Sequence, residues 1–334
     1  MNLSLAPLHG VTNRTFRSLW FRHFGGFDRV FAPFIVATPS APLKRNFFKD
    51  LVGDPSWVPP LIPQILGNDA GSFIDACETL ARMGYTSVNW NLGCPFPMVA
   101  KKMRGSGLLP YPERVARMLD EICSKNPLPV SVKLRLGRMG DDEIDALLPV
   151  LWQYPLEEII LHPRTGIQMY TGAADIDRFC AVSKRLEDAS PRCIPLVYNG
   201  DIFDLSSYRL IARRVHPVAA FMIGRGVLRD PFLPADIRAS LEDPSMHTVP
   251  QEERAGGVKL FMEDMFEAWQ EILHGPAHVL DKMKELWSWL GPSFSGCDRE
   301  RLAIKRSKTL DEYQNAQEAL FERGHWAPVG NDNQ

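Results

Sequence analysis

The sequence predicts an α/β fold: a (β/α)8 barrel of the TIM-barrel type followed by a small C-terminal bundle of α-helices. Three observations support this prediction. Short apolar runs typical of buried parallel strands alternate with amphipathic stretches of helical spacing over about 235 residues. The alternation yields eight strands, which is the number that closes such a barrel. No glycine fingerprint follows the first strand, which disfavours an open doubly wound sheet.

The expected strands are apolar or rich in β-branched residues, and they cover 3–8, 29–36, 60–66, 87–91, 130–134, 158–162, 195–199 and 219–224. Helices are expected between them at 70–83, 112–124, 142–152, 175–186 and 205–214, several with Asp, Ser or Pro near the N-terminus. A long irregular segment follows the second strand, from residue 37 through Pro59. Its length is typical of a lid or a binding loop.

The strand and helix alternation stops at residues 242–250, where two prolines bracket polar residues, as in a linker. Beyond it, apolar residues at helical spacing predict helices at 258–273, 277–290 and 310–322, within a bundle of three to five helices. We therefore expect a cofactor-binding catalytic barrel at 1–241, a linker at 242–250, a helical region at 251–325 and a tail at 326–334.

Composition sets broad limits on function. The 334 residues are 45% hydrophobic and 23% charged, as in an ordinary soluble protein with a large core. Six cysteines without a C-x-x-C pair predict reduced thiols and disfavour a structural metal site. The N-terminus has no export signal and no long apolar run occurs, so a cytoplasmic location is expected. A net charge of −2 means that a nucleic-acid partner must be held by a local basic patch.

Polar residues follow nearly every expected strand, at the end where barrels of this class carry their chemistry. In chain order these are Pro7 with His9, Gln64, Asn91 with Cys94, Lys133 with Arg135, His162 with Arg164 and Thr165, Asn199-Gly200-Asp201, and Gly224-Arg225-Gly226. A Lys or Gln within an apolar strand carries a desolvation cost unless a partner compensates it. The pattern therefore predicts a ligand site.

Two of these strand ends indicate which ligand. Asn199-Gly200-Asp201 and Gly224-Arg225-Gly226 follow the seventh and eighth strands, where such barrels commonly bind a phosphate. Gln64 and Lys133 suit the edge of a planar ring that accepts electrons. Together these residues favour flavin mononucleotide (FMN). The alternatives are ordinary structural turns at the glycines and a salt-bridged Lys133 on the barrel rim.

Cys94 lies on a turn bracketed by Gly93 and Pro95, directly after the fourth expected strand. A free cysteine is most often a small buried hydrophobe. A thiol at the mouth of a strand, among the polar strand ends described above, is instead placed for chemistry.

Six sequence blocks occur in the order and spacing of one known family: Ala6-Pro7-Leu8-His9-Gly10-Val11-Thr12, Asn91-Leu92-Gly93-Cys94-Pro95, Lys133-Leu134-Arg135, His162-Pro163-Arg164-Thr165, Asn199-Gly200-Asp201 and Met222-Ile223-Gly224-Arg225-Gly226. The sequence resembles the tRNA-dihydrouridine synthases over the whole barrel. The C-terminal region resembles, more loosely, the helical domain of the bacterial DusC branch.

The resemblance implies an FMN enzyme that reduces the C5–C6 double bond of a uridine in tRNA with electrons from NADPH. Cys94 matches the family's proton donor to C5, while reduced FMN gives hydride to C6. The DusC likeness favours uridine 16 of the D-loop. Asn91 is expected at the uracil edge and Arg135 at the base or its phosphate. The implied FMN-binding residues are Pro7, Leu8, His9, Gln64, Lys133, His162, Asn199, Gly200, Asp201, Gly224 and Arg225.

A folded tRNA must be clamped while its target base is swung out. The basic residues expected to bind it are Lys101, Lys102, Arg104, Lys282, Lys284, Arg299, Arg301, Lys305 and Arg306. A solvated helix face is an equally good explanation of such a run. The nearby aromatic residues Trp287, Trp289 and Phe294 are expected in the core.

Two other classes of function stay open on the sequence alone. One is an FMN oxidoreductase that acts on a free pyrimidine or another small molecule. The other is a tRNA-binding or folding factor that only retains the barrel. The length of the chain favours a monomer without an obligate protein partner.

Overall fold

The computed structural model describes residues 1–39, 48–51, 59–215, 217–243 and 246–328. Most of the expected lid or binding loop at 37–59, part of the expected linker at 242–250 and most of the expected tail at 326–334 lie outside the described residues. No helix in the described part is both long and apolar enough to cross a bilayer.

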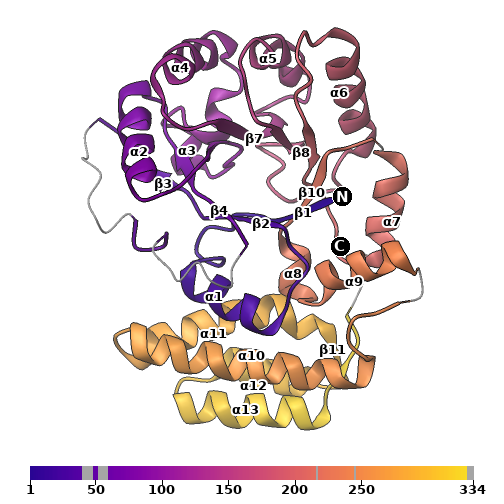
Figure 1. Ribbon diagram of the computed structural model, residues 1–334. Coiled ribbons are helices and arrows are strands. Elements are labelled where there is room, and N and C mark those ends of the chain that lie inside the picture. Colours follow the sequence, from indigo (N-terminus) through magenta and orange to yellow (C-terminus); the bar gives the residue numbers. More distant parts are fainter. Residues whose placement is uncertain (40–47, 52–58, 216, 244–245, 329–334) are drawn as a thin grey trace.

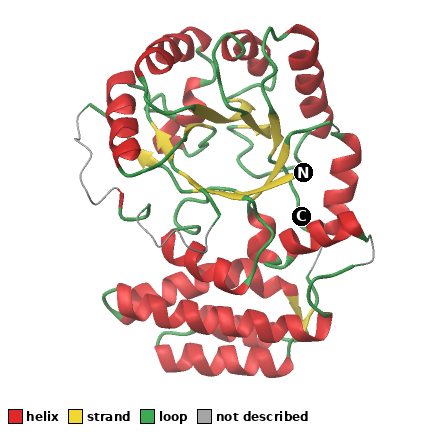
Figure 2. Cartoon of the chain, in the orientation of Figure 1, coloured by secondary structure: helices red, strands yellow, loops and turns green. Residues whose placement is uncertain are grey.

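The barrel is built from parallel strands at the eight places where the sequence predicts them. These are β1 (Asn2–Leu5), β2 (Arg29–Phe31), β3 (Ile35–Val36), β4 (Leu61–Ile62), β5 (Gln64–Leu66), β6 (Val88–Leu92), β7 (Val130–Gly137), β8 (Ile159–Thr165), β9 (Leu196–Tyr198) and β10 (Ala220–Ile223). The order of hydrogen-bonded strands around the sheet is β3-β5-β6-β7-β8-β9-β10-β1-β2-β4. β2 and β3 are halves of one expected strand, and β4 and β5 are halves of the next. Pairing of β2 with β4 and of β3 with β5 therefore closes the ring (Figure 2).

Helices surround this ring (Figure 1). The five helices expected in the barrel are confirmed as α2 (Ala70–Arg82), α4 (Pro112–Lys125), α5 (Glu143–Leu151), α6 (Ile176–Ala189) and α7 (Leu205–Arg214). The side chains of Asp69, Asp175 and Asp204 accept N-terminal N–H groups of three of them, which explains where these helices begin. The sequence prediction missed α1 (Arg14–His23), α3 (Pro97–Ala100), α8 (Arg225–Arg229) and α9 (Leu233–Glu242).

The C-terminal region forms a layer of helices against one side of the barrel (Figure 1). It consists of α10 (Gln251–Ile272), α11 (Pro276–Leu290), α12 (Asp298–Arg306) and α13 (Leu310–Arg323), with the short strands β11 (Phe294–Ser295) and β12 (His325–Trp326) paired antiparallel. The three expected helices are confirmed, and four helices fall within the expected range of three to five.

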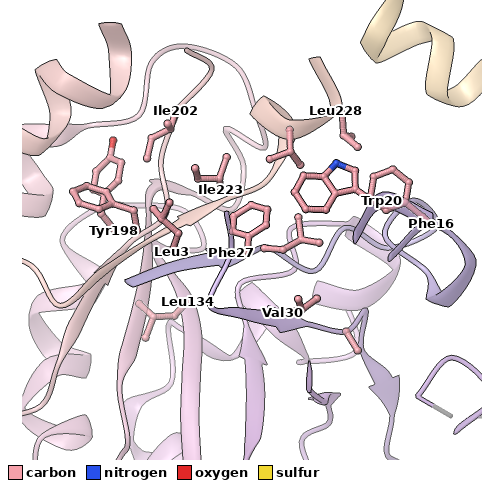
Figure 3. Packing of buried hydrophobic residues seen from close by; sticks show 14 of the residues in the cluster. Leu3, Phe16, Trp20, Phe27, Val30, Leu134, Tyr198, Ile202, Ile223 and Leu228 are labelled. Carbon is pink, nitrogen blue, oxygen red and sulfur yellow. The ribbon is translucent and has the colours of Figure 1, made fainter. Parts of the chain in front are cut away.

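An aromatic seam joins this layer to the barrel through α1. Phe261 of α10 lies 5.9 Å from Phe16 and 5.3 Å from Phe24 between ring centroids, both in edge-on contacts. Figure 3 shows Phe16 and Trp20 of α1 beside Leu228 of α8. All five side chains are buried. Burial of such aromatic side chains stabilises the contact between layers, and it fixes α11 beside the open end of the barrel.

Arg254 of α10 is a buried ionic anchor in the same region. Its guanidinium donates to Asp236 at 2.6 Å and to the carbonyl oxygen of Val249 at 3.0 Å, and both partners of the ion pair are 3% exposed at the side chain. We expect Arg254→Ala to lower the free energy of unfolding by about 3–5 kcal/mol, because it leaves buried carboxylates without their cation. Urea denaturation measures the free energy of unfolding. The control is Arg22→Ala, which removes an exposed ion pair and is expected to lower the free energy of unfolding by less than about 1 kcal/mol. Equal unfolding midpoints for both variants would contradict the role of Arg254 as a buried ionic anchor.

Candidate active site

A cavity of about 280 Å³ opens at the carboxyl ends of the barrel strands. It brings together most of the residues that the sequence singled out: Pro7, Leu8, His9, Gln64, Asn91, Cys94, Lys133, Arg135, His162, Asn199, Gly200, Gly224 and Arg225. These residues come from loops and strands up to about two hundred positions apart in the chain. The closed ring of strands places them around one space.

A chain of buried amides forms one wall of the cavity. Gln64 donates to the side-chain oxygen of Asn89 at 2.7 Å, and Asn91 donates to the side-chain oxygen of Gln64 at 2.7 Å. Asn89 in turn donates to Ser131 Oγ at 2.8 Å. Because all four side chains are buried and bonded to one another, their orientation is fixed before any ligand binds.

The turn that carries Cys94 is held from both sides. The Asn91 side-chain oxygen accepts the backbone N–H groups of Gly93 and Cys94 at 3.1 and 2.9 Å. Ser106 donates to the Cys94 carbonyl oxygen through its backbone N–H at 3.0 Å and through its hydroxyl at 2.9 Å. A Cβ at Gly105 would lie 2.8 Å from Cys94 Cβ, so only glycine permits this approach. The thiol is thereby fixed at the cavity wall.

Burial raises the pKa of the Cys94 thiol above its ordinary value, although the positive charges of Arg135, Lys133 and Arg138 act in the opposite direction. The side chain lines the cavity and only 7% of the residue is exposed. Cys94 therefore keeps its proton at neutral pH, as a proton donor requires and a thiolate nucleophile does not.

Lys133 carries a positive charge with no protein counter-ion. Within the described part of the chain, its ammonium forms neither an ion pair nor a hydrogen bond. Burial, and secondarily the charge of Arg135, lowers its pKa to about 7. The alternative of a salt-bridged Lys133 is therefore wrong for the described residues. A partly buried lysine that lacks a partner among the described residues and lines a cavity points to a ligand with acceptor atoms.

His162 is a neutral imidazole on β8, the strand that pairs with the strand of Lys133. Its Nδ1 lies 2.5 Å from the carbonyl oxygen of Asn199, and burial holds the pKa of the ring well below its usual value. The N–H must be on Nδ1 to donate to that carbonyl, so Nε2 is left as an acceptor toward Arg164 Nη1 at 3.4 Å.

The end of the cavity at Arg225 carries net positive charge. Asp201 accepts Arg225 Nη2 at 2.6 Å and Arg164 Nη1 at 2.9 Å on the same oxygen. One carboxylate thus faces two guanidinium groups, which leaves one positive charge uncompensated. Asp201 is not among the residues that line the cavity, so it orients these cations from behind.

Several other expected binding residues are committed to the fold. Arg135 donates to the carbonyl oxygens of Gly93, Thr165 and Met169 at 3.0, 2.9 and 2.7 Å, so it ties two loops together at the cavity wall. Four basic residues likewise have protein partners: Arg104 with Asn68, Lys282 with Gly10 and Glu285, Lys284 with Ser307, and Arg301 with Asp298 and Gly291. The exposed candidates are Lys101, Lys102, Arg299, Lys305 and Arg306.

The cavity also contains residues that the sequence analysis missed. Phe34, Phe96 and Tyr170 come from loops, and Glu285 and Trp289 come from α11. Trp289 was expected in the core together with Trp287 and Phe294; these two are buried, whereas Trp289 packs against the core only partly buried and also lines the cavity. Glu285 and Trp289 are four residues apart and share a helix face. That spacing was readable, but the sequence does not show that this face meets the barrel.

Comparison with known proteins identifies the family. A model of the dihydrouridine synthase family, Dus, matches residues 4–322. The chain belongs to this family. It is an enzyme, a dihydrouridine synthase, as the six sequence blocks led us to expect.

Curated relatives agree with this assignment. The chain is 29% identical over 239 residues to a "Probable tRNA-dihydrouridine synthase" of Rhodobacter capsulatus, with 71% of each chain covered. It is 29% identical over 254 residues to "tRNA-dihydrouridine synthase B" of Vibrio parahaemolyticus, which covers 75% of this chain and 76% of the relative. Among solved structures, morphinone reductase matches at 12% identity and a TM-score of 0.49 over 71% of this chain and 85% of its own. The relative from Vibrio is of the B type, so the DusC branch stays a prediction.

Proposed function

We propose that this dihydrouridine synthase reduces uridine 16 in the D-loop of tRNA, with FMN in the barrel cavity and NADPH as the electron donor. One observation carries the chemical part of this proposal. A protonated thiol, Cys94, lines the same cavity as the uncompensated cation Lys133. Reduction of the uracil double bond needs a proton donor and a site that stabilises electron-rich groups, and these two residues supply them.

The residues of the cavity fit FMN. Lys133 lacks an acceptor that a ring oxygen or nitrogen would supply, and Gln64 has its amide oriented by Asn89 and Asn91. The uncompensated positive charge at Arg164 and Arg225 suits a phosphate group. We expect Pro7, Leu8, His9, Gln64, Lys133 and His162 to hold the ring, and Asn199, Gly200, Gly224 and Arg225 to hold the phosphate, with Asp201 behind them. FMN bound there would supply the hydride for C6 of uracil.

The chain itself supplies the proton and its position. Cys94 Sγ donates its proton to C5, and the raised pKa keeps that proton in place at neutral pH. Asn91 fixes the backbone of the turn through Gly93 and Cys94, and it is expected to present its amide to the uracil edge. Arg135 holds the same turn through the Gly93 carbonyl oxygen. Because these groups are buried, reorganisation during the reaction is small.

The exposed cations are placed for a tRNA substrate. Lys101 and Lys102 follow α3, next to the Cys94 turn. Lys305 and Arg306 end α12, which packs on α11 where Lys284 donates to the Ser307 carbonyl oxygen. The opposite edge of α11 contributes Glu285 and Trp289 to the cavity. Of these cations, Lys101 and Lys102 lie beside the place where a swung-out uridine must enter, and Lys305 and Arg306 can bind only more distant phosphates of the tRNA.

The test compares substrates and positions. Purified protein with FMN and NADPH is incubated with unmodified tRNA, and dihydrouridine is located by nucleoside mass spectrometry and sequencing. We expect product at position 16 and none with free uridine or orotate. Product at another position would correct the assignment of uridine 16. Turnover of free uridine or orotate without tRNA would favour the small-molecule oxidoreductase, and a protein that binds neither flavin nor tRNA would overturn the proposal.

Asn91 offers a test of how the thiol is positioned. Asn91→Ala removes the acceptor for the Gly93 and Cys94 N–H groups, and we expect kcat to fall about 10- to 100-fold because the reacting group shifts. The control is Asn126→Ala, since the Asn126 side chain also accepts a backbone N–H, from Leu128 at 3.2 Å, but lies in a turn outside the cavity. Equal kcat values for the two variants and the wild type would contradict the positioning role.

A further inference from the structure

Exposed apolar side chains gather on one arc of the cavity mouth. Of the fourteen large exposed hydrophobic residues in the described part of the chain, six lie in the segments that follow the consecutive strands β6, β7 and β8, and five of these six lie within about 12 residues of the end of their strand. They are Phe96, Met98, Met139, Ile167 and Tyr170, with exposed fractions of 48%, 81%, 63%, 51% and 41%. We call these five residues the rim patch. Scattered exposed apolar residues need no explanation, but a cluster at a functional site marks an interaction surface.

The three loops that carry the rim patch are tied together by Arg138. Its guanidinium donates to the carbonyl oxygen of Pro95 at 2.8 Å and to Ser106 Oγ at 3.3 Å. Its backbone carbonyl oxygen accepts the N–H of Ile167 at 3.0 Å. The loops that carry Phe96, Met139 and Ile167 therefore lie side by side, although they follow different strands.

The loop that presents Met139 is held by a carboxylate. Glu143 accepts the backbone N–H groups of Arg138 at 2.7 Å, Met139 at 2.8 Å and Gly140 at 3.1 Å. These bonds satisfy the polar backbone, while the Met139 side chain stays exposed. Because the backbone of this loop is already fixed, little backbone entropy is lost when a partner binds to it.

The rim patch continues into the cavity. Phe96 and Tyr170 line the cavity and belong to the rim patch at the same time. The exposed cations Lys101 and Lys102 lie in the same segment as Met98. The surface therefore combines apolar area with positive charge, and it adjoins the mouth of the cavity, where a uridine must enter. Unstacked nucleobases expose flat apolar faces beside anionic phosphates, and they match this combination.

We propose that the rim patch binds the unstacked bases that flank the target uridine in the tRNA loop, with Met98, Met139 and Ile167 in contact with base faces and Lys101 and Lys102 on adjacent phosphates. The inference rests on the proposed function, since it assigns a surface to the same substrate. This contact would keep the tRNA loop open. When the target uridine is swung out, the bases on either side of it lose their stacking contact with it, and the apolar side chains of the rim patch replace that contact.

The experiment uses the double variant M139S/I167S of the full-length flavin-loaded protein, because neither side chain lines the cavity. The matched control is L210S, since Leu210 of α7 is 59% exposed on the outside of the barrel. We expect the Kd for unmodified tRNA to rise at least about fivefold in the double variant, given the contribution of base stacking, and to stay unchanged in the control. In M139S/I167S, the slope of log Kd against the logarithm of the salt concentration should equal that of the wild type. In a second double variant, Lys101→Ala with Lys102→Ala, this slope should decrease by about 1 to 2.

Each outcome decides the matter. Unchanged tRNA affinity in M139S/I167S, with dihydrouridine formed normally, overturns the rim patch and leaves the proposed function standing. A loss of self-association without a loss of tRNA affinity assigns the surface to a second copy of the chain and also overturns it. Failure of the wild type to form dihydrouridine in tRNA is a failure of the proposed function, and bound-flavin absorbance with the unfolding midpoint shows that the variants are folded.

Discussion

Replacing Cys94 by alanine is expected to lower kcat for dihydrouridine formation about 10²- to 10⁴-fold, the usual loss when a positioned proton donor is removed. The reason is that no other thiol lines the cavity in the described part of the chain. Flavin and tRNA should still bind, because the loop is held by Asn91 and Ser106 and not by the thiol. Nucleoside mass spectrometry measures the product, and flavin absorbance measures cofactor retention.

The control for this experiment is Cys123→Ala, since Cys123 is exposed and outside the cavity. Full activity of the Cys94 variant would remove the thiol from the mechanism. A pH profile adds a second test: the protonated thiol is the active form, so kcat should fall as the pH rises through its raised pKa. Cys94→Ser should lack this alkaline limb, because a serine hydroxyl does not titrate in that range.

Lys133→Met is expected to weaken flavin binding at least about tenfold, because in the proposed site Lys133 would give the ring a charge-assisted hydrogen bond. Affinity of the wild type for FMN should also fall as the pH rises through about 7, where Lys133 loses its charge. Titration of the apoprotein with FMN, followed by fluorescence quenching, measures both effects. The control is Lys125→Met, which replaces an exposed lysine of α4. Unchanged flavin affinity in Lys133→Met would show that the buried cation serves another ligand.

The same substitution should stabilise the flavin-free protein. The folded pKa of Lys133 is about 7 and the ordinary value is 10.5, so the unfolded chain binds more protons between these two values. The free energy of unfolding therefore rises with pH across this window, and the cost of the buried ammonium is largest below pH 7. At pH 6 we expect the Lys133→Met apoprotein to be about 1–3 kcal/mol more stable than the wild type. A decrease in stability would mean that a protein group compensates the charge.

The strands were predictable because each carries its own local signal. Buried parallel strands such as Ala220–Ile223 consist of apolar residues, and turn residues such as Gly224 mark their ends. The polar residues at the strand ends were predictable for the same reason, since Lys133 and Gln64 stand out against apolar neighbours. By contrast, α8 spans only five residues and contains Gly226, and α9 carries Pro234 in its first turn. Packing of α8 against α11 and of α9 against α7, not a local signal, therefore decides that they are helical.

The roles of the basic residues could not be read from the sequence. Nothing in the sequence distinguishes Lys282 and Lys284 from Lys305. In the structure, Lys282 and Lys284 donate hydrogen bonds to backbone carbonyl oxygens, whereas Lys305 is exposed. The same holds for Arg135, whose guanidinium is used by three carbonyl groups. Charge and spacing give the number of cations in a segment, while the partner of each cation depends on which loop folds against it.

The sequence by itself determined the barrel and the family and singled out Cys94 as the candidate proton donor, because alternation of strands and helices and the residues at strand ends are local properties of the chain. Only the tertiary structure decided that Lys133 has no counter-ion among the described residues, that α11 supplies Glu285 and Trp289 to the cavity, and that the loops of Phe96, Met139 and Ile167 lie side by side. These facts depend on contacts between residues far apart in the chain. The free energy of such contacts comes from desolvation and pairing in three dimensions, which no linear pattern records.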